Sequence, residues 1–270
     1  MTKIPTALTI AGSDSGGGAG IQADLRTFSF HCVHGTSAIT CVTAQNTIGV
    51  TRVDPISPKA VVAQIEAVTN DISIDASKTG MLLNREIIEA VALQVEKLSL
   101  KQLVVDPVMV SRTGAQLIDD RAITSLQNKL IPKALVVTPN RYEAQLLSGI
   151  EINSLEEMKL AAKIVHQLGA ATVLVKGGGM AGKLRGIDVW FDGEGWETLE
   201  TETVETNNTH GTGCTLSAAI AANLALGKDL WESVREAKNY VTTALKYALN
   251  IGAGTGPIGH FFPLLLDKKL

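Results

Sequence analysis

Residues 209–226 read Thr-His-Gly-Thr-Gly-Cys-Thr-Leu-Ser-Ala-Ala-Ile-Ala-Ala-Asn-Leu-Ala-Leu. The run from Leu216 to Leu226 is apolar and alanine-rich, which predicts a buried helix, and the glycines before it predict a tight turn. A helix N-terminus carries unpaired N–H groups and about half a positive charge, so we expect an anion site here, with Cys214 at its mouth as a thiolate. On this motif alone, Cys214 as a small buried apolar residue beside packing glycines is an equal alternative.

Outward from this segment, short β-rich apolar runs alternate with helical patterns at Val61–Val68 and Ile87–Val95, and Ser154–Glu157 reads as a capping box. This alternation is typical of a parallel sheet covered by helices on both faces. Trp190–Leu199, interrupted by Asp-Gly-Glu-Gly, predicts an antiparallel hairpin at one edge. The strands expected are Ala7–Ile10, Ser37–Val42, Leu103–Val105, Leu135–Val137 and Thr172–Val175.

Length and a hydrophobic content of 45% allow one large soluble α/β domain or two small ones. Since no linker or repeat interrupts the chain, we expect a single domain over residues 1–270. A net charge of −3 argues against nucleic acid or an anionic membrane as partner. Three cysteines without paired spacing argue against disulfides and structural zinc, and together with the lack of a signal peptide or membrane-length apolar run they favour the cytoplasm. The apolar tail Pro263–Leu266 is expected either to cap the core or to join a subunit interface.

A second glycine motif, Gly18–Ala23, matches the G-x-G-x-x-A fingerprint of dinucleotide-binding proteins. Such a site needs an acidic residue about 20 residues further on, at the end of the next strand. That region reads Thr43–Thr47 and has no carboxylate, so a dehydrogenase is a minor alternative. No G-x-x-x-x-G-K-[S/T] motif is present, which excludes a P-loop enzyme.

Polar residues follow the predicted strands at the points where these strands end. In open parallel sheets, ligands bind outside the carboxyl ends of the strands, so we expect these segments to form one site. The segments are Gly12–Gly20, Gln45-Asn46, Lys78–Gly80, Asp106-Pro107, Thr138–Asn140 and Lys176–Gly179.

Seven blocks in this order resemble the ribokinase superfamily, and more closely the hydroxymethylpyrimidine and phosphomethylpyrimidine kinases of thiamine biosynthesis. Many sugar-kinase relatives carry Asp at the position of Cys214, so cysteine points to these pyrimidine kinases or to a similar pyridoxal-kinase branch. The residues between Asn140 and Glu143 depart from the family's pattern. The blocks are Ala11–Asp24, Thr43–Thr47, Lys78–Met81, Val105–Met109, Thr138–Asn140, Lys176–Gly178 and His210–Thr215.

The resemblance implies a ribokinase-like three-layer α/β/α fold and a homodimer. It also implies an ATP- and Mg²⁺-dependent enzyme that phosphorylates 4-amino-5-hydroxymethyl-2-methylpyrimidine and then its monophosphate. Two alternatives stay open: a pyridoxal or pyridoxine kinase with the same phosphate machinery, and a non-catalytic sensor of nucleotide or thiamine precursor.

Phosphoryl transfer needs donors around the moving group, a charge on the phosphates and an acceptor base. We assign the anion hole to the N–H groups of Gly211, Thr212, Gly213 and Cys214, and the ATP-phosphate charge to Lys176. Cys214 is the expected general base for the substrate hydroxyl.

For the metal, Asn140 and Glu143 offer hard oxygen donors that could hold a Mg²⁺ ion with its waters. From spacing alone, a helix cap followed by a solvated acid is nearly as good an interpretation, and the resemblance favours the metal.

For the substrate, we choose Gln45, because a glutamine amide complements the amine and ring nitrogen of an aminopyrimidine edge. Asp106 is expected to assist the metal or the alcohol, or to cap the turn before Pro107. Family positions that line the same pocket match Gly12, Asp24, Met81 and Val108.

Overall fold

The computed structural model describes residues 3–100, 102–109 and 118–266. A nine-stranded sheet runs through them in the order β3-β2-β1-β4-β5-β6-β7-β8-β9. The strands from β2 to β7 in this order pair in parallel, while β3 at one edge and the hairpin β8–β9 at the other are antiparallel. The strands are β1 (Thr6–Asp14), β2 (His34–Gln45), β3 (Val50–Pro55), β4 (Ala76–Thr79), β5 (Leu103–Val105), β6 (Val136–Val137), β7 (Thr172–Val175), β8 (Asp188–Phe191) and β9 (Trp196–Leu199).

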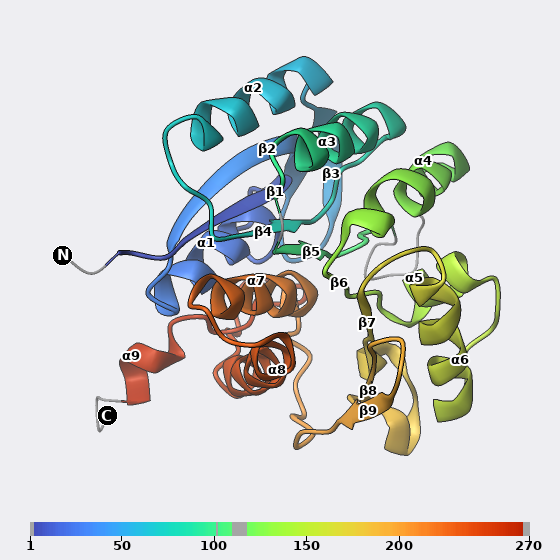
Figure 1. Cartoon of the computed structure of the whole chain (residues 1–270). Helices are drawn as coiled ribbons and strands as arrows, with labels where there is room; N and C mark the ends of the chain where they lie inside the picture. Colours follow the sequence, from blue (N-terminus) through green and yellow to red (C-terminus); the bar gives the residue numbers. More distant parts are fainter. Residues whose placement is uncertain (1–2, 101, 110–117, 267–270) are drawn as a thin grey trace.

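Helices cover both faces of the sheet and make the three layers visible in Figure 1. One apolar core joins the sheet to α2 to α6, and the other joins it to α1, α7 and α8. The α-helices are α1 (Gly20–Phe30), α2 (Pro58–Thr69), α3 (Arg85–Lys97), α4 (Asp120–Ser125), α5 (Arg141–Ser148), α6 (Leu155–His166), α7 (Thr212–Ala225), α8 (Leu230–Lys246) and α9 (Phe262–Leu266).

The predicted strands, helices and edge hairpin are confirmed, and β3 is the strand that the sequence did not indicate. Every residue of β3 is exposed, so the strand has no buried face and no alternating apolar pattern. The predicted capping box at Ser154 forms only in part. Ser154 Oγ accepts from the Glu157 N–H, but the Glu157 carboxylate accepts from the Asn153 N–H, one residue before the N-cap.

The helix α7 lies between the sheet and α8, which explains its apolar, alanine-rich sequence. Small side chains allow a helix to approach its neighbours closely. From Thr215 to Leu224 all its residues are buried, as predicted for this segment. The strand ends and the first turn of α7 therefore meet on a rigid support.

The C-terminal tail combines a buried and an exposed part. Phe262 is buried against Tyr240 and Tyr247 and caps a small apolar cluster. Leu264 and Leu266 are instead 60% and 59% exposed. Of the two alternatives for this tail, core capping is thus confirmed for Phe262 only.

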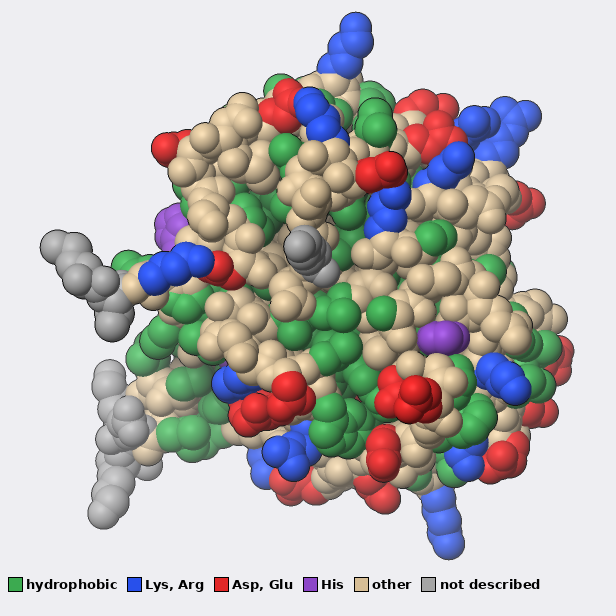
Figure 2. Space-filling view, in the orientation of Figure 1, with side chains coloured by type: hydrophobic (Ala, Val, Ile, Leu, Met, Phe, Trp, Pro, Cys, Tyr) green, Lys and Arg blue, Asp and Glu red, His purple; other side chains and the backbone are tan. Residues whose placement is uncertain are grey.

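Two surface properties bear on partners. On the face shown in Figure 2, acidic and basic side chains are interspersed over the described chain. Within the described residues, none of the helices has the length and apolarity needed to cross a membrane.

Candidate active site

The first turn of α7 is built as an anion site. Gly211 precedes it with φ 87°, and a Cβ atom there would overlap the carbonyl oxygen of Gly18. Within the described residues, the N–H groups of Gly211, Gly213 and Cys214 donate no hydrogen bond, and the Thr212 N–H makes only a long one of 3.4 Å to its own turn. These amides point the positive end of the helix at the strand ends, which is what an anion requires.

We expect Gly211→Ala to destabilise the protein because of both backbone strain and steric overlap. A left-handed conformation costs a residue with a Cβ about 1–2 kcal/mol, and overlap with Gly18 adds to this. Gly227→Ala is the matched control, since Gly227 has φ 84° but no atom within 4 Å of an added Cβ. Urea unfolding should give a larger loss for Gly211→Ala than for Gly227→Ala. Equal losses would show that the close approach to Gly18 carries no energy.

Lys176 lies directly beside this turn, as predicted. It follows β7, and a Cβ added to Gly213 would be 3.4 Å from Lys176 Nζ. Burial disfavours the charge of Lys176, but the neighbouring carboxylates of Asp106 and Glu143 outweigh it and raise its pKa. The site therefore holds a permanent cation next to unpaired amides.

Asp106 holds Lys176 in place, with 2.8 Å between Asp106 Oδ1 and Lys176 Nζ. Its two oxygens also accept from Thr138 and from Ser217, each at 3.3 Å. Burial opposes ionisation of Asp106, yet Lys176 and Lys78 lower its pKa below the ordinary value. This carboxylate is 2% exposed, so the structure assigns it to positioning Lys176, and contact with substrate stays a prediction.

Asn140 and Glu143 form a reciprocal capping box at the start of α5. Asn140 Oδ1 accepts from the Glu143 N–H at 3.0 Å, and Glu143 Oε2 accepts from the Asn140 N–H at 2.8 Å. Glu143 also accepts from the backbone of Met109, and burial raises its pKa to about 7 despite Lys176 nearby. The cap interpretation is therefore correct, although Glu143 is buried and not solvated.

These donors do not fit a preformed magnesium site. Both carboxylate contacts of Glu143 are backbone hydrogen bonds, and burial raises its pKa and so disfavours the charged form that Mg²⁺ prefers. Among the described residues, no group of three or more His, Cys, Asp or Glu side chains is placed to hold a metal. The predicted metal role of Asn140 and Glu143 thus finds no support in this geometry.

Beneath the site, Lys78 and Asp24 form a fully buried ion pair. Lys78 Nζ donates to both oxygens of Asp24 at 2.9 Å, and Thr9 donates to one of them at 2.6 Å. The expectation that Asp24 lines an open pocket is not met, because its side chain has no exposed surface. No role was predicted for Lys78, although Lys78 is the first residue of one of the strand-end segments.

Cys214 lies at the third position of α7 and is partly exposed. The Gly20 N–H donates to its sulfur, and the charge of Lys78 acts on it. Burial outweighs both and raises the pKa of Cys214 to about 11. The structure therefore does not support the predicted thiolate: burial, together with the nearby carboxylates of Asp24 and Asp106, disfavours the anion more than Lys78 and the Gly20 N–H favour it.

The expected substrate residues lie at the neighbouring strand ends. A Cβ on Gly12 would be 3.2 Å from Met81 Cε, so these two residues are in contact distance. Val108 is partly exposed and follows Asp106. Gln45 ends β2, and its Nε2 lies 3.3 Å from Nε2 of His210, the residue before the anion hole.

His210 and Asp14 are the other residues that the sequence did not single out. His210 Nε2 lies 2.9 Å from Asp14 Oδ2. The same carboxylate accepts from the N–H groups of Gly16, Gly18 and Ala19, at 2.8–3.0 Å, and so shapes the glycine loop. Both residues stand in the sequence blocks that carry the family resemblance, Ala11–Asp24 and His210–Thr215, but only the fold brings them together across 196 positions.

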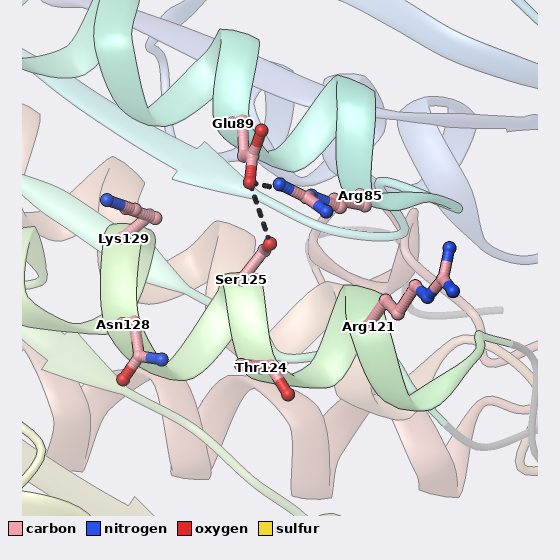
Figure 3. A pocket seen from close by; sticks show the side chains of 7 residues that line it. All are labelled: Arg85, Glu89, Arg121, Thr124, Ser125, Asn128 and Lys129. Carbon is pink, nitrogen blue, oxygen red and sulfur yellow. Dashed lines mark hydrogen bonds and ion pairs between the residues drawn. The ribbon is translucent and has the colours of Figure 1, made fainter.

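A hollow of about 290 Å³ lies away from these residues, between α3 and α4 (Figure 3). Glu89 points into it and accepts from Arg85 and Ser125 at 2.9 and 3.1 Å. None of its lining residues is a predicted site residue. They are Arg85, Glu89, Arg121, Thr124, Ser125, Asn128 and Lys129.

The sheet and the helices on its two faces form the three-layer, ribokinase-like fold. At the strand ends, a helix terminus and a lysine are placed to receive phosphate, and this arrangement defines a small-molecule kinase. Among solved structures, the chain resembles the ADP complex of Bacillus subtilis pyridoxal kinase, with TM-score 0.90 and 41% identity over 96% of this chain and 98% of that one. The chain belongs to the phosphomethylpyrimidine kinase family, whose model matches residues 14–259.

Two further relatives carry the pyrimidine name. The hydroxymethylpyrimidine/phosphomethylpyrimidine kinase of Synechococcus elongatus is 59% identical over 97% of this chain and 99% of its own length. The crystal structure of phosphomethylpyrimidine kinase from Clostridium difficile has TM-score 0.80 and 42% identity, covering 89% of this chain and 99% of that one.

Proposed function

We propose that this protein transfers the γ-phosphoryl group of ATP to the hydroxymethyl group of 4-amino-5-hydroxymethyl-2-methylpyrimidine, and then a second one to the monophosphate, in thiamine biosynthesis. The observation that carries the proposal is the pairing of unengaged amides at the start of α7 with Lys176, next to Cys214. The relatives named above support the substrate class.

The phosphate half of the site acts through charge and position. Phosphoryl transfer has a loose transition state, so its main demand is stabilisation of negative charge on the moving group. The amides from Gly211 to Cys214 meet that charge as fixed donors, and Lys176 meets it as a point charge. Asp106 keeps Lys176 aimed at the turn.

The proton half of the site is Cys214. As a thiol with a pKa of about 11, it gives up its proton rarely, but the thiolate that then forms is a strong enough base to deprotonate the attacking alcohol. The phosphate monoester of the second step has a second pKa near 6 and needs little help. We therefore assign Cys214 to the first transfer above all.

The acceptor is expected to bind at the edge formed by Gln45, with Gly12, Met81 and Val108 beside the ring. Gly12 leaves room because any larger residue would meet Cys41 and Met81. The predicted Mg²⁺ remains part of this proposal, and because the capping box leaves no free ligand set, we expect the ion to arrive on the ATP phosphates. A homodimer and a cytoplasmic location also stay predictions.

Pyridoxal kinase is the second candidate, favoured by the similarity in fold to the Bacillus subtilis enzyme. Steady-state kinetics of the purified protein with the aminopyrimidine and with pyridoxal distinguishes the two. We expect kcat/KM to be higher for the aminopyrimidine; a higher value for pyridoxal would overturn the assignment. If the protein turns over ATP with neither the aminopyrimidine nor pyridoxal, the alternative of a non-catalytic sensor remains.

A further inference from the structure

Gln45 is held between two polar neighbours that can fix which way its amide faces. In the structure, Gln45 Nε2 lies 3.3 Å from His210 Nε2, and Gln45 Oε1 lies 3.1 Å from Thr43 Oγ1. A planar amide can occupy the same space in two orientations that exchange oxygen and nitrogen, and its hydrogen-bond partners decide between them.

Asp14 determines whether His210 Nε2 acts as a hydrogen-bond donor or acceptor. Its carboxylate accepts from three backbone N–H groups of the glycine loop, and although burial opposes ionisation, His210 and these amides lower its pKa. An ionised carboxylate can only accept, and it lies 2.9 Å from His210 Nε2. That nitrogen must therefore carry a proton.

Thr43 determines which atom of the Gln45 amide lies at the other end. Thr43 has one hydroxyl proton, and the backbone oxygen of Ser13, at 2.9 Å, is its nearer acceptor. The lone pairs of Thr43 Oγ1 then face Gln45. With its proton directed at Asp14, His210 Nε2 has no lone pair to accept from an amide NH₂, so the Gln45 oxygen fits beside it better than the nitrogen. Thr43 Oγ1 in turn offers lone pairs to a donor, so one amide orientation suits both neighbours.

We propose that His210 is a specificity-determining residue: held by Asp14, its Nε2–H favours the amide orientation that places Gln45 Oε1 beside His210 and Nε2 beside Thr43, the reverse of the one drawn in the structure. This inference rests on the proposed function, which makes Gln45 the residue that contacts the pyrimidine. Each amide atom keeps one bonding position for the substrate. The substrate amine then lies on the His210 side and the ring nitrogen on the Thr43 side.

This polarity decides where the reacting hydroxyl goes. In the aminopyrimidine, the 5-hydroxymethyl group is next to the 4-amino group and away from the ring nitrogen N3. An amine on the His210 side thus places the hydroxymethyl group toward Gly211 and the turn with Cys214. The reverse amide orientation would place it toward Thr43, away from the phosphate site.

The kinetic test compares the 4-amino substrate with its 4-oxo analogue, whose edge presents an oxygen acceptor and an N3–H donor. A fixed amide rejects the reversed edge; one bidentate pair discriminates by roughly 10- to 100-fold. We expect the wild-type ratio of kcat/KM to lie in this range and to fall about tenfold in His210→Phe. The control is His34→Phe, an exposed residue at the opposite end of β2.

If the ratio of kcat/KM between the 4-amino and 4-oxo compounds stays unchanged in His210→Phe, the inference is overturned. This holds even if both activities fall, because damage to the glycine loop would lower kcat/KM for both compounds alike. If the wild-type protein phosphorylates neither pyrimidine, the proposed function itself is refuted. The amide orientation can be measured without catalysis. In NMR spectra of the wild-type protein, the side-chain NH₂ protons of Gln45 should show an NOE to the Thr43 methyl group; an NOE to the His210 ring alone would contradict the inference.

Discussion

Lys176→Met is expected to lower kcat/KM for phosphoryl transfer by about 10²–10³-fold, the usual effect of removing one preorganised donor to a developing negative charge. The lysine is 13% exposed and stands beside Gly213, so its charge acts in a nearly water-free place. Both transfers should suffer, because each moves a phosphoryl group past the same cation. Single-turnover kinetics with the alcohol and with the monophosphate measures this.

The substitution also leaves Asp106 without its partner, and an unpaired buried charge destabilises a protein strongly. The double variant Lys176→Met with Asp106→Asn separates stability from catalysis, since it removes the orphaned charge but does not restore the cation. We expect it to regain thermal stability and to remain inactive. Lys163→Met, at an exposed position of α6, is the control and should be unchanged. Wild-type turnover in Lys176→Met would remove this lysine from the mechanism.

Cys214→Ala should slow the first transfer by about 10²–10⁴-fold, the range of general-base catalysis, and the second transfer far less. Separation of the mono- and diphosphate products in a quench experiment gives the two rates. Equal loss in both steps would mean that the side chain serves only the geometry of the anion hole.

The pH dependence follows from the raised pKa of Cys214, about 11. Below this value the thiolate fraction grows about tenfold for each pH unit, so the first transfer should accelerate with a slope near one between about pH 7 and 10. The slope should vanish in Cys214→Ala, and the second transfer should lack it in both proteins. A flat profile in the wild type would exclude the thiolate as base.

The sequence predicted the order of the elements well, because buried strands and amphipathic helices leave a periodic pattern. It missed β3, whose residues are all exposed, since pairing at a sheet edge needs no apolar face. Glycines, Lys176 and the start of α7 were predicted together at one site, because parallel strands deliver their carboxyl ends to the same edge.

Pairing between buried charges was not predictable in this way. Lys78 and Asp24 are 54 positions apart, and the choice of partner depends on packing in three dimensions. The predicted direction of the pKa shift of Cys214 was wrong for a related reason. The helix terminus is visible in the sequence, but the depth of burial, which decides the sign here, is not.

In this mechanism, the amides at the start of α7 receive the γ-phosphoryl group beside the sulfur of Cys214. A crystal structure with a non-hydrolysable ATP analogue tests this placement directly. We predict γ-phosphate oxygens within about 3.2 Å, hydrogen-bonding distance, of the Gly213 and Cys214 N–H groups, with the sulfur facing the acceptor side. A γ-phosphorus bound elsewhere, with these amides still unengaged, would contradict the mechanism.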